Sequence, residues 1–146
     1  MLSFFCCNQK QEHSETYLRA LNYYEEGCNL IPDTVIKNDS LLKAFPKFIE
    51  AARLLEILPE DMSKEEISLV SKTYHEMSKI MFLKMSFNTM IDALKRALYY
   101  QEMNIDSNMM AILTADLAVT YSSTTNDTTE IIIPFTSCLA RVSLNS

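Results

Sequence analysis

The sequence predicts an all-α protein: a right-handed solenoid of about three antiparallel helix pairs, with about six helices in all. A group of five residues is repeated 42 positions later in the same order, spacing and chemical type. The first set is Phe45, Ile49, Glu50, Ala51 and Arg53, and the second is Phe87, Ile91, Asp92, Ala93 and Lys95. A period of roughly 34 to 47 residues with two helices per unit is typical of helical solenoids. The 146 residues include one glycine and four prolines. Because tight turns at positive φ need glycine, this composition disfavours β-sandwiches and phosphate-binding glycine loops.

Two helices are expected in the first part of the chain, after an irregular tail over residues 1–13. Ser14 is a suitable N-cap for a helix over 14–31, and a second helix is expected over 40–58. Pro46 falls inside the second span. Proline removes a helical hydrogen bond and clashes with the preceding turn, so this helix is expected either to begin near Ala44 or to kink.

The remaining helices are indicated by caps and by apolar residues at helical spacing. Ser63 and Glu66 form a capping box that opens a third helix. The expected spans are 63–84, 87–103, 108–122 and 128–144. The last of these contains three consecutive isoleucines, whose β-branched side chains lower the helix propensity. The helical domain is therefore expected to cover residues 14–144.

The middle unit carries a recognisable set of large and small residues. Its first helix has an aromatic, a large–small pair and another bulky residue, and its second helix has an aromatic start with small residues in the middle: Tyr74, Met77, Ser78 and Met81, then Phe87, Ala93 and Ala97. From residue 74 to about residue 142 the chain resembles the tetratricopeptide repeat (TPR) family, in the longer-period form seen in kinesin light chain. The glycine that the family uses between the helices of a unit is absent. The resemblance implies an array whose concave groove holds a segment of another protein.

The resemblance also indicates where this groove lies. On the third helix His75, Lys79 and Phe82 stand at i, i+4 and i+7 and are expected to form a stripe on the concave side. In the family this stripe usually contacts the ligand. A cation and an aromatic suggest an acidic or carboxylate-ended partner, while Ala115 and Val119 on the fifth helix replace the rest of the family's carboxylate clamp and leave an apolar pocket. The alternative is that Lys79 is simply solvated.

Composition excludes several function classes. Thirteen basic and nineteen acidic residues give a net charge of -6 without a Lys/Arg cluster, which argues against nucleic-acid binding. The four cysteines lack the spacing of a metal site or a disulfide framework, which indicates a reducing, cytoplasmic setting. No nucleophile, base or metal-ligand set can be assembled from the sequence, so no cofactor, metal or catalytic residue is expected.

The leading hypothesis is therefore a non-enzymatic adaptor or scaffold for another protein. The alternative is a self-associating helical bundle, such as a viral, parasite or effector-type regulatory protein, with an accidental repeat resemblance. Because the segment 131–144 is apolar on more than one side, we also expect either homodimerisation through the last helix or a longer array of which this chain is a piece.

The N-terminal segment supplies one further hypothesis. Cys6 and Cys7 follow Phe4 and Phe5, a pattern that resembles N-termini carrying two S-palmitoyl groups. Two acyl chains give stable membrane attachment, whereas one does not. The sequence therefore predicts either peripheral membrane association through these thiols or an irregular tail with two incidental cysteines.

Overall fold

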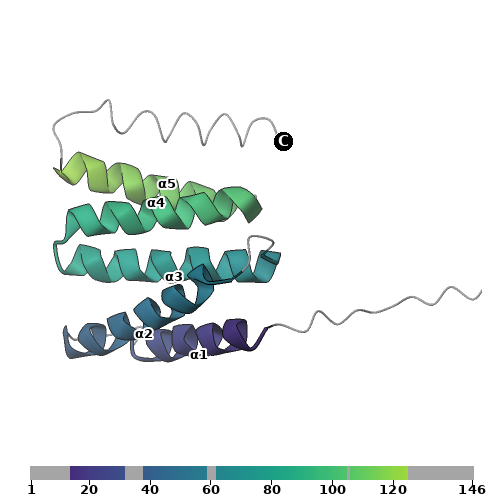
Figure 1. The fold of residues 1–146 in the computed structure, drawn as a ribbon. Helices are drawn as coiled ribbons and strands as arrows, with labels where there is room; N and C mark the ends of the chain where they lie inside the picture. Colours follow the sequence, from purple (N-terminus) through teal and green to yellow (C-terminus); the bar gives the residue numbers. More distant parts are fainter. Residues whose placement is uncertain (1–13, 32–37, 59–61, 105, 125–146) are drawn as a thin grey trace, which may run out of the picture.

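The computed structural model describes residues 14–31, 38–58, 62–104 and 106–124, and within these ranges the chain is entirely helical apart from short links (Figure 1). The five helices are α1 (Glu15–Asn29), α2 (Asn38–Glu56), α3 (Lys64–Leu83), α4 (Phe87–Asn104) and α5 (Ser107–Thr124). The predicted all-α class is confirmed, with five helices described where about six were expected. The tail over 1–13 and the predicted helix over 128–144 lie outside the described residues. None of the helices in the described part is long and apolar enough to cross a membrane.

Two of the predicted helix starts are formed as the sequence indicates. The Ser14 side chain accepts a hydrogen bond from the Tyr17 backbone N–H at 3.1 Å. At α3 the capping box is complete, because Ser63 Oγ accepts from the Glu66 N–H at 3.2 Å and Glu66 Oε2 accepts from the Ser63 N–H at 2.8 Å. These bonds satisfy backbone donors that the first turn of a helix leaves unpaired.

Helix α2 begins before both of its expected starts, residue 40 and Ala44. It starts at Asn38, so Pro46 lies inside the helix and does not mark its beginning. The expected start near Ala44 is wrong. The Pro46 side chain is exposed, so its ring lies on the outer side of α2, while the buried Phe48 and Ala44 face the neighbouring helices. Burial of this inner face stabilises α2 against the local cost of proline.

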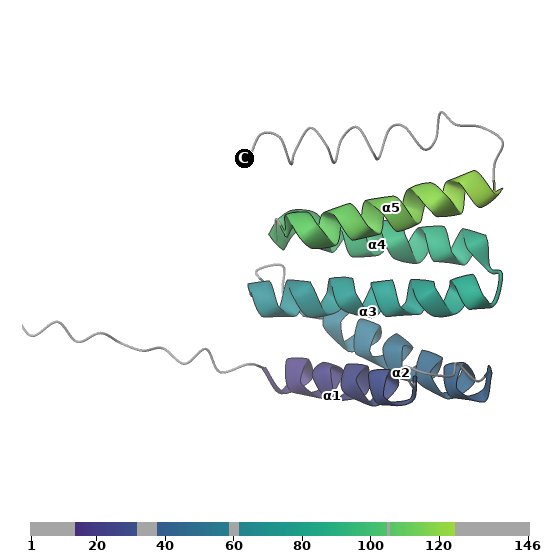
Figure 2. The same ribbon diagram turned by 180° about the vertical axis from the view of Figure 1, so that it is seen from behind.

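The helices are stacked in chain order, from α1 at the bottom of Figure 1 to α5 at the top, and the reverse view in Figure 2 shows the same order. The main packing is between neighbours in the chain: α1 with α2, α2 with α3, α3 with α4, and α4 with α5. Between α3 and α4 the chain reverses over three residues, 84–86. Here Met85 takes a positive φ of 57°, and the Ser86 N–H donates to the Met81 carbonyl at 2.9 Å. Met85 thus supplies the left-handed residue that glycine usually provides at a helix end.

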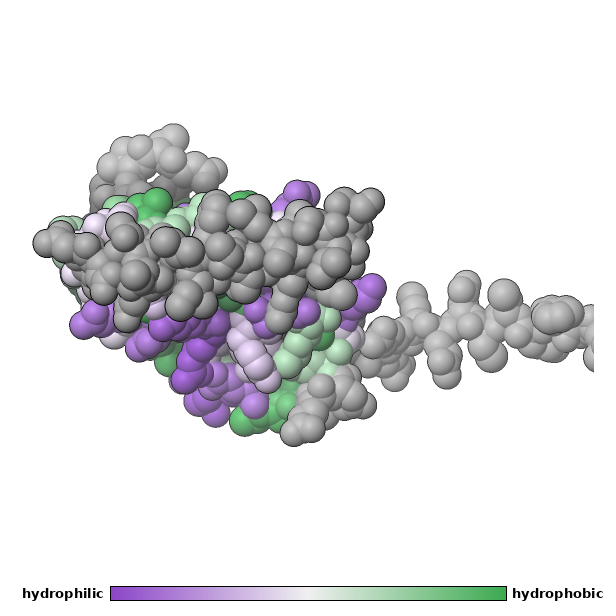
Figure 3. Space-filling view, turned by 90° about the horizontal axis from the view of Figure 1, so that it is seen from above, coloured by the Kyte–Doolittle hydropathy of each residue, from purple (hydrophilic) through white to green (hydrophobic). Residues whose placement is uncertain are grey.

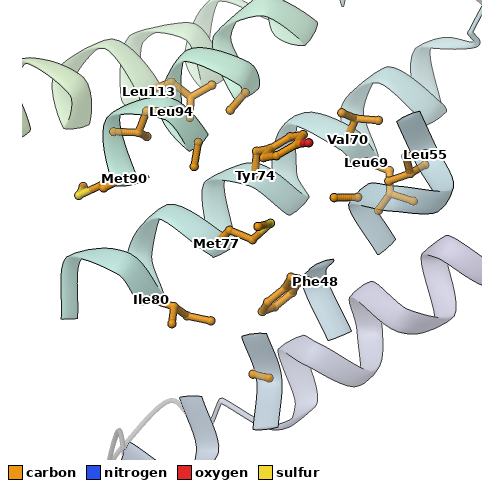
Figure 4. Packing of buried hydrophobic residues seen from close by; sticks show 14 of the residues in the cluster. Phe48, Leu55, Leu69, Val70, Tyr74, Met77, Ile80, Met90, Leu94 and Leu113 are labelled. Atoms are coloured by element: carbon orange, nitrogen blue, oxygen red, sulfur yellow. The ribbon is translucent and has the colours of Figure 1, made fainter. Parts of the chain in front are cut away.

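The hydrophobic core runs through the stack between successive helices (Figure 4). Its largest fully buried apolar side chains come from four of the five helices: Phe48, Leu55, Val70, Ile80, Leu94, Leu113 and Leu117. The one glycine of the sequence, Gly27, lies on α1 against the Phe48 ring of α2. A Cβ atom at position 27 would stand 2.8 Å from two atoms of that ring. Glycine therefore allows α1 and α2 to approach closely.

A polar cluster joins α2, α3 and α4 at the surface of this core. The Tyr74 hydroxyl donates to a Glu56 carboxylate oxygen, and Arg96 donates to the same oxygen and, at 3.0 Å, to the Tyr74 hydroxyl. The Arg96 guanidinium also lies 5.5 Å from the centre of the Tyr74 ring, and Tyr100 stacks on that ring with centroids 6.4 Å apart. Burial, followed by the bond to Glu56, raises the pKa of the Tyr74 hydroxyl above its ordinary value.

This cluster predicts a loss of stability at alkaline pH. The folded state holds the Tyr74 proton more tightly than the unfolded state does. The hydroxyl therefore stabilises the fold fully at pH values below its unfolded pKa of about 10, and this stabilisation is lost as the pH rises above that value. Between pH 9 and pH 11 the wild-type protein should lose about 1 kcal/mol more unfolding free energy than Tyr74→Phe, measured by urea denaturation. Equal losses in the two proteins would contradict this role of the hydroxyl.

Candidate interaction groove

One exposed stripe of α3 borders two hollows in the surface. Its residues are spaced three, four or seven positions apart, which places them on one side of the helix: Glu65, Ser68, Lys72, Lys79 and Phe82. The hollow at the N-terminal end of the stripe lies against α1 and has a volume of about 410 Å³, with Tyr17, Leu21 and Tyr24 opposite the α3 residues. The hollow at the C-terminal end lies against α5.

The second of these, which we call the α3–α5 hollow, is mainly apolar. Its volume is about 310 Å³, and its apolar walls are Phe82 and Leu83 of α3, Met90 of α4 and Val119 of α5. The polar lining residues are Ser78, Lys79 and Asp116. Phe82 is 46% exposed and Val119 60% exposed. The Phe82 ring is oriented by an edge contact with Phe87, with centroids 6.3 Å apart.

Hydrophobic side chains also reach the surface elsewhere on the molecule. Seen from above, the described residues show hydrophobic patches between hydrophilic ones (Figure 3). Leu18 of α1, Leu42 of α2 and Ile57 after α2 are examples of large exposed side chains outside the α3–α5 hollow. Single exposed apolar residues are ordinary in folded proteins. Some of them border other hollows, such as Tyr99 and Met103, which line a hollow of about 470 Å³ together with Glu56. The α3–α5 hollow differs because its lining is more apolar.

Three of the five residues predicted for the groove line this hollow together: Lys79, Phe82 and Val119. Ala115 is exposed on α5, one turn before Val119. Lys79 is already engaged on its own helix, since its ammonium lies 2.7 Å from Glu76 Oε1. Such i, i+3 pairs on an exposed helix face are weak. Lys79 therefore remains able to exchange Glu76 for another carboxylate.

The fifth predicted residue, His75, is placed differently from the expectation. It is buried, with 8% of its surface exposed, and its Nε2 lies 2.9 Å from Asp116 Oδ2. Because a carboxylate only accepts hydrogen bonds, the imidazole N–H is the donor. His75 therefore holds α3 to α5 and does not form an open part of the stripe.

Four lining residues of the hollow were not among the groove residues expected from the sequence: Ser78, Leu83, Met90 and Asp116. Of these, Asp116 lies next to Ala115. It had a signal in the sequence: it is the one charged residue within the span of α5, Ser107–Thr124. Its hydrogen-bond partner could not be found from the sequence. That partner, His75, is 41 positions away in the chain, so only the packing of α5 near α3 reveals it.

The described residues show no cluster suited to binding a metal ion. They contain no group of three or more His, Cys, Asp or Glu side chains that could hold a metal ion. Burial raises the pKa of the Cys28 thiol, which makes it a poorer nucleophile. Cys6 and Cys7 lie outside the described residues, so the acylation hypothesis stays a prediction.

Fold and site together define an all-helical protein with an exposed, mainly apolar hollow between α3 and α5. The chain matches no protein-family model, no curated protein and no solved structure.

Proposed function

We propose that this protein is a non-enzymatic adaptor that binds a segment of another protein in a groove bordered by α1, α3 and α5. The observation that carries the proposal is the α3–α5 hollow, where Phe82, Leu83 and Val119 expose apolar surface around a volume of about 310 Å³. Apolar hollows with a few polar groups at their edge are the usual form of binding sites. A helix or extended segment with a bulky apolar side chain fits this chemistry.

The arrangement of the helices supports a TPR-like array as the scaffold for this groove. The main packing joins consecutive helices, and α3 shares one hollow with α1 and the other with α5. In a right-handed array of antiparallel pairs, these odd-numbered helices are the first members of their pairs and line the concave side. The predicted helix over 128–144 would complete a third pair.

The test is whether capture of a partner depends on the hollow. Val119→Glu places a carboxylate on its apolar wall, so partners recovered by affinity capture from a cytosolic extract and quantified by mass spectrometry should fall at least tenfold, since about 1.4 kcal/mol of lost binding energy corresponds to a factor of ten. Leu42→Glu makes the same type of change at an exposed leucine of α2 and should leave recovery unchanged.

Two results would count against the adaptor. Equal recovery with Val119→Glu and wild type would show that the hollow is not the binding site. If sedimentation shows a wild-type oligomer that Val119→Glu converts to a monomer, the alternative of a self-associating helical protein is favoured. The melting temperatures of both variants must match that of the wild type for either comparison to hold.

Lys79 supplies the proposed preference for an acidic or carboxylate-ended segment. Its ammonium is held at the edge of the hollow by Glu76 at 2.7 Å, and a partner carboxylate would replace Glu76. Lys79→Glu should therefore weaken capture, whereas Lys43→Glu, an exposed change on α2, should not.

We further propose that the protein is cytoplasmic and attached to membranes by S-acylation of Cys6 and Cys7. Wild-type protein should then fractionate with membranes and be released by hydroxylamine, which cleaves thioesters. Cys6→Ser/Cys7→Ser should be found in the cytosol, while Cys28→Ser should behave as wild type. Wild-type protein that is entirely cytosolic would refute the attachment.

A further inference from the structure

The polar side chains of the α3–α5 hollow are not equivalent. Ser78 is almost fully buried, with 1% of its surface exposed, and its hydroxyl donates to the His75 carbonyl at 2.7 Å. Lys79 is engaged by Glu76 at the rim. The third polar lining residue is Asp116, whose side chain is 42% exposed.

Asp116 presents unused hydrogen-bond acceptor capacity to the hollow. Its Oδ2 accepts the bond from His75 Nε2 at 2.9 Å, but a carboxylate has two oxygens with about four acceptor sites and no donor. Helix α5 contains no basic residue, and the one cation among the lining residues, Lys79, is paired with Glu76 at 2.7 Å. The polar requirement of this part of the hollow is therefore a hydrogen-bond donor from the partner.

The Asp116 carboxylate is also held in place before any partner arrives. His75 is buried on α3 and fixes one carboxylate oxygen, so the remaining acceptor sites have a restricted orientation. Binding to a group that is already ordered costs less conformational entropy. The hollow thus combines a fixed acceptor with apolar walls formed by Phe82, Met90 and Val119.

We infer that the α3–α5 hollow takes the indole ring of a tryptophan in the partner segment, with the ring against the apolar walls and its N–H donating to Asp116. Indole has a large apolar body and a nitrogen that only donates, which matches walls that are apolar and an acceptor that cannot donate. The Phe82 ring, which is 46% exposed, is suited to contact an aromatic ring. Tryptophan is also common among the residues that dominate protein interfaces. This inference rests on the proposed function and specifies the partner's anchor.

Two isomeric probes test the inference directly. 3-Methylindole is the tryptophan side chain, whereas 1-methylindole has the same size but lacks the N–H. In methyl-group NMR titrations of the full chain, both should shift the signals of Met90 and Val119, and 3-methylindole should bind about three- to tenfold more tightly, the range for one hydrogen bond. The protein itself contains no tryptophan, so probe fluorescence gives an independent reading.

Substitution of the acceptor should remove the difference between the isomers. Asp116→Ala should bind both equally, while Asp92→Ala, which removes an exposed carboxylate of α4 outside the hollow, should keep the wild-type ratio. Equal binding of the isomers to wild-type protein overturns the inference without any variant, as do shifts centred away from Met90 and Val119. These outcomes leave the adaptor proposal intact, because that proposal depends on partner capture by Val119→Glu.

Discussion

Phe48→Ala should lower the free energy of unfolding by about 3–5 kcal/mol, the range for removing a fully buried phenylalanine. The Phe48 side chain is 0% exposed, its ring makes an edge contact with Tyr24 at 5.8 Å between centroids, and Gly27 of α1 lies directly against it. Removing the ring leaves a cavity between α1 and α2 that the backbone at Gly27 cannot fill. Urea denaturation followed by circular dichroism measures the loss.

Phe82→Ala is the matched control, because it makes the same chemical change at a ring that is 46% exposed. It should lower stability by about 1 kcal/mol or less. It should nevertheless reduce partner capture, since Phe82 is a wall of the α3–α5 hollow. A Phe48→Ala protein as stable as Phe82→Ala would contradict the described packing of α1 on α2.

Leu94→Ala should lower the free energy of unfolding by about 2–5 kcal/mol. Leu94 is 0% exposed on α4 and lies near Leu113 of α5 in the core (Figure 4). Because α4 packs between α3 and α5, a cavity at Leu94 weakens both contacts of that helix. The same denaturation measurement applies.

Leu42→Ala provides the comparison for Leu94→Ala, at a leucine that is 56% exposed. Leu42→Ala should lower the free energy of unfolding by about 1 kcal/mol or less. Hydrogen exchange adds a second readout: Leu94→Ala should increase exchange mainly in α4 and α5, and Phe48→Ala mainly in α1 and α2. Uniform increases across all described helices would show that the helices unfold as one unit.

Local signals in the sequence were sufficient to find the five helices that the structure describes. Ser14 and the Ser63–Glu66 capping box act through residues three positions away, so their effect can be seen in the sequence itself. The start of α2 could not be found in this way. Its position depends on burial of Ala44 and Phe48 against neighbouring helices, which outweighs the local preference of Pro46. The right-handed solenoid and its relation to the TPR family remain predictions.

The candidate site was predictable where it depends on helical spacing and not where it depends on contacts between helices. Lys79 and Phe82 lie on one face of α3 because they are three residues apart. Val119 lies on α5, and its place in the same hollow was expected only from the resemblance to the repeat family. His75 lies four residues before Lys79 and so has the spacing of the same face of α3. It is nevertheless buried, and it is hydrogen-bonded to Asp116 of α5. Tyr74 is similar: its aromatic place in the repeat is visible in the sequence, whereas its bonds to Glu56 and Arg96 connect three helices.

The packing of consecutive helices has a consequence for the growing chain on the ribosome. The main contacts join elements close in sequence, so few long loops have to close before packing energy is gained, an arrangement associated with fast folding. Phe48 illustrates the point, because its neighbours Tyr24 and Gly27 precede it in the chain. Once α2 has left the exit tunnel, the first helix pair already contains the residues of its own core. Synthesis of α4 and α5 then extends a structure that has begun to form.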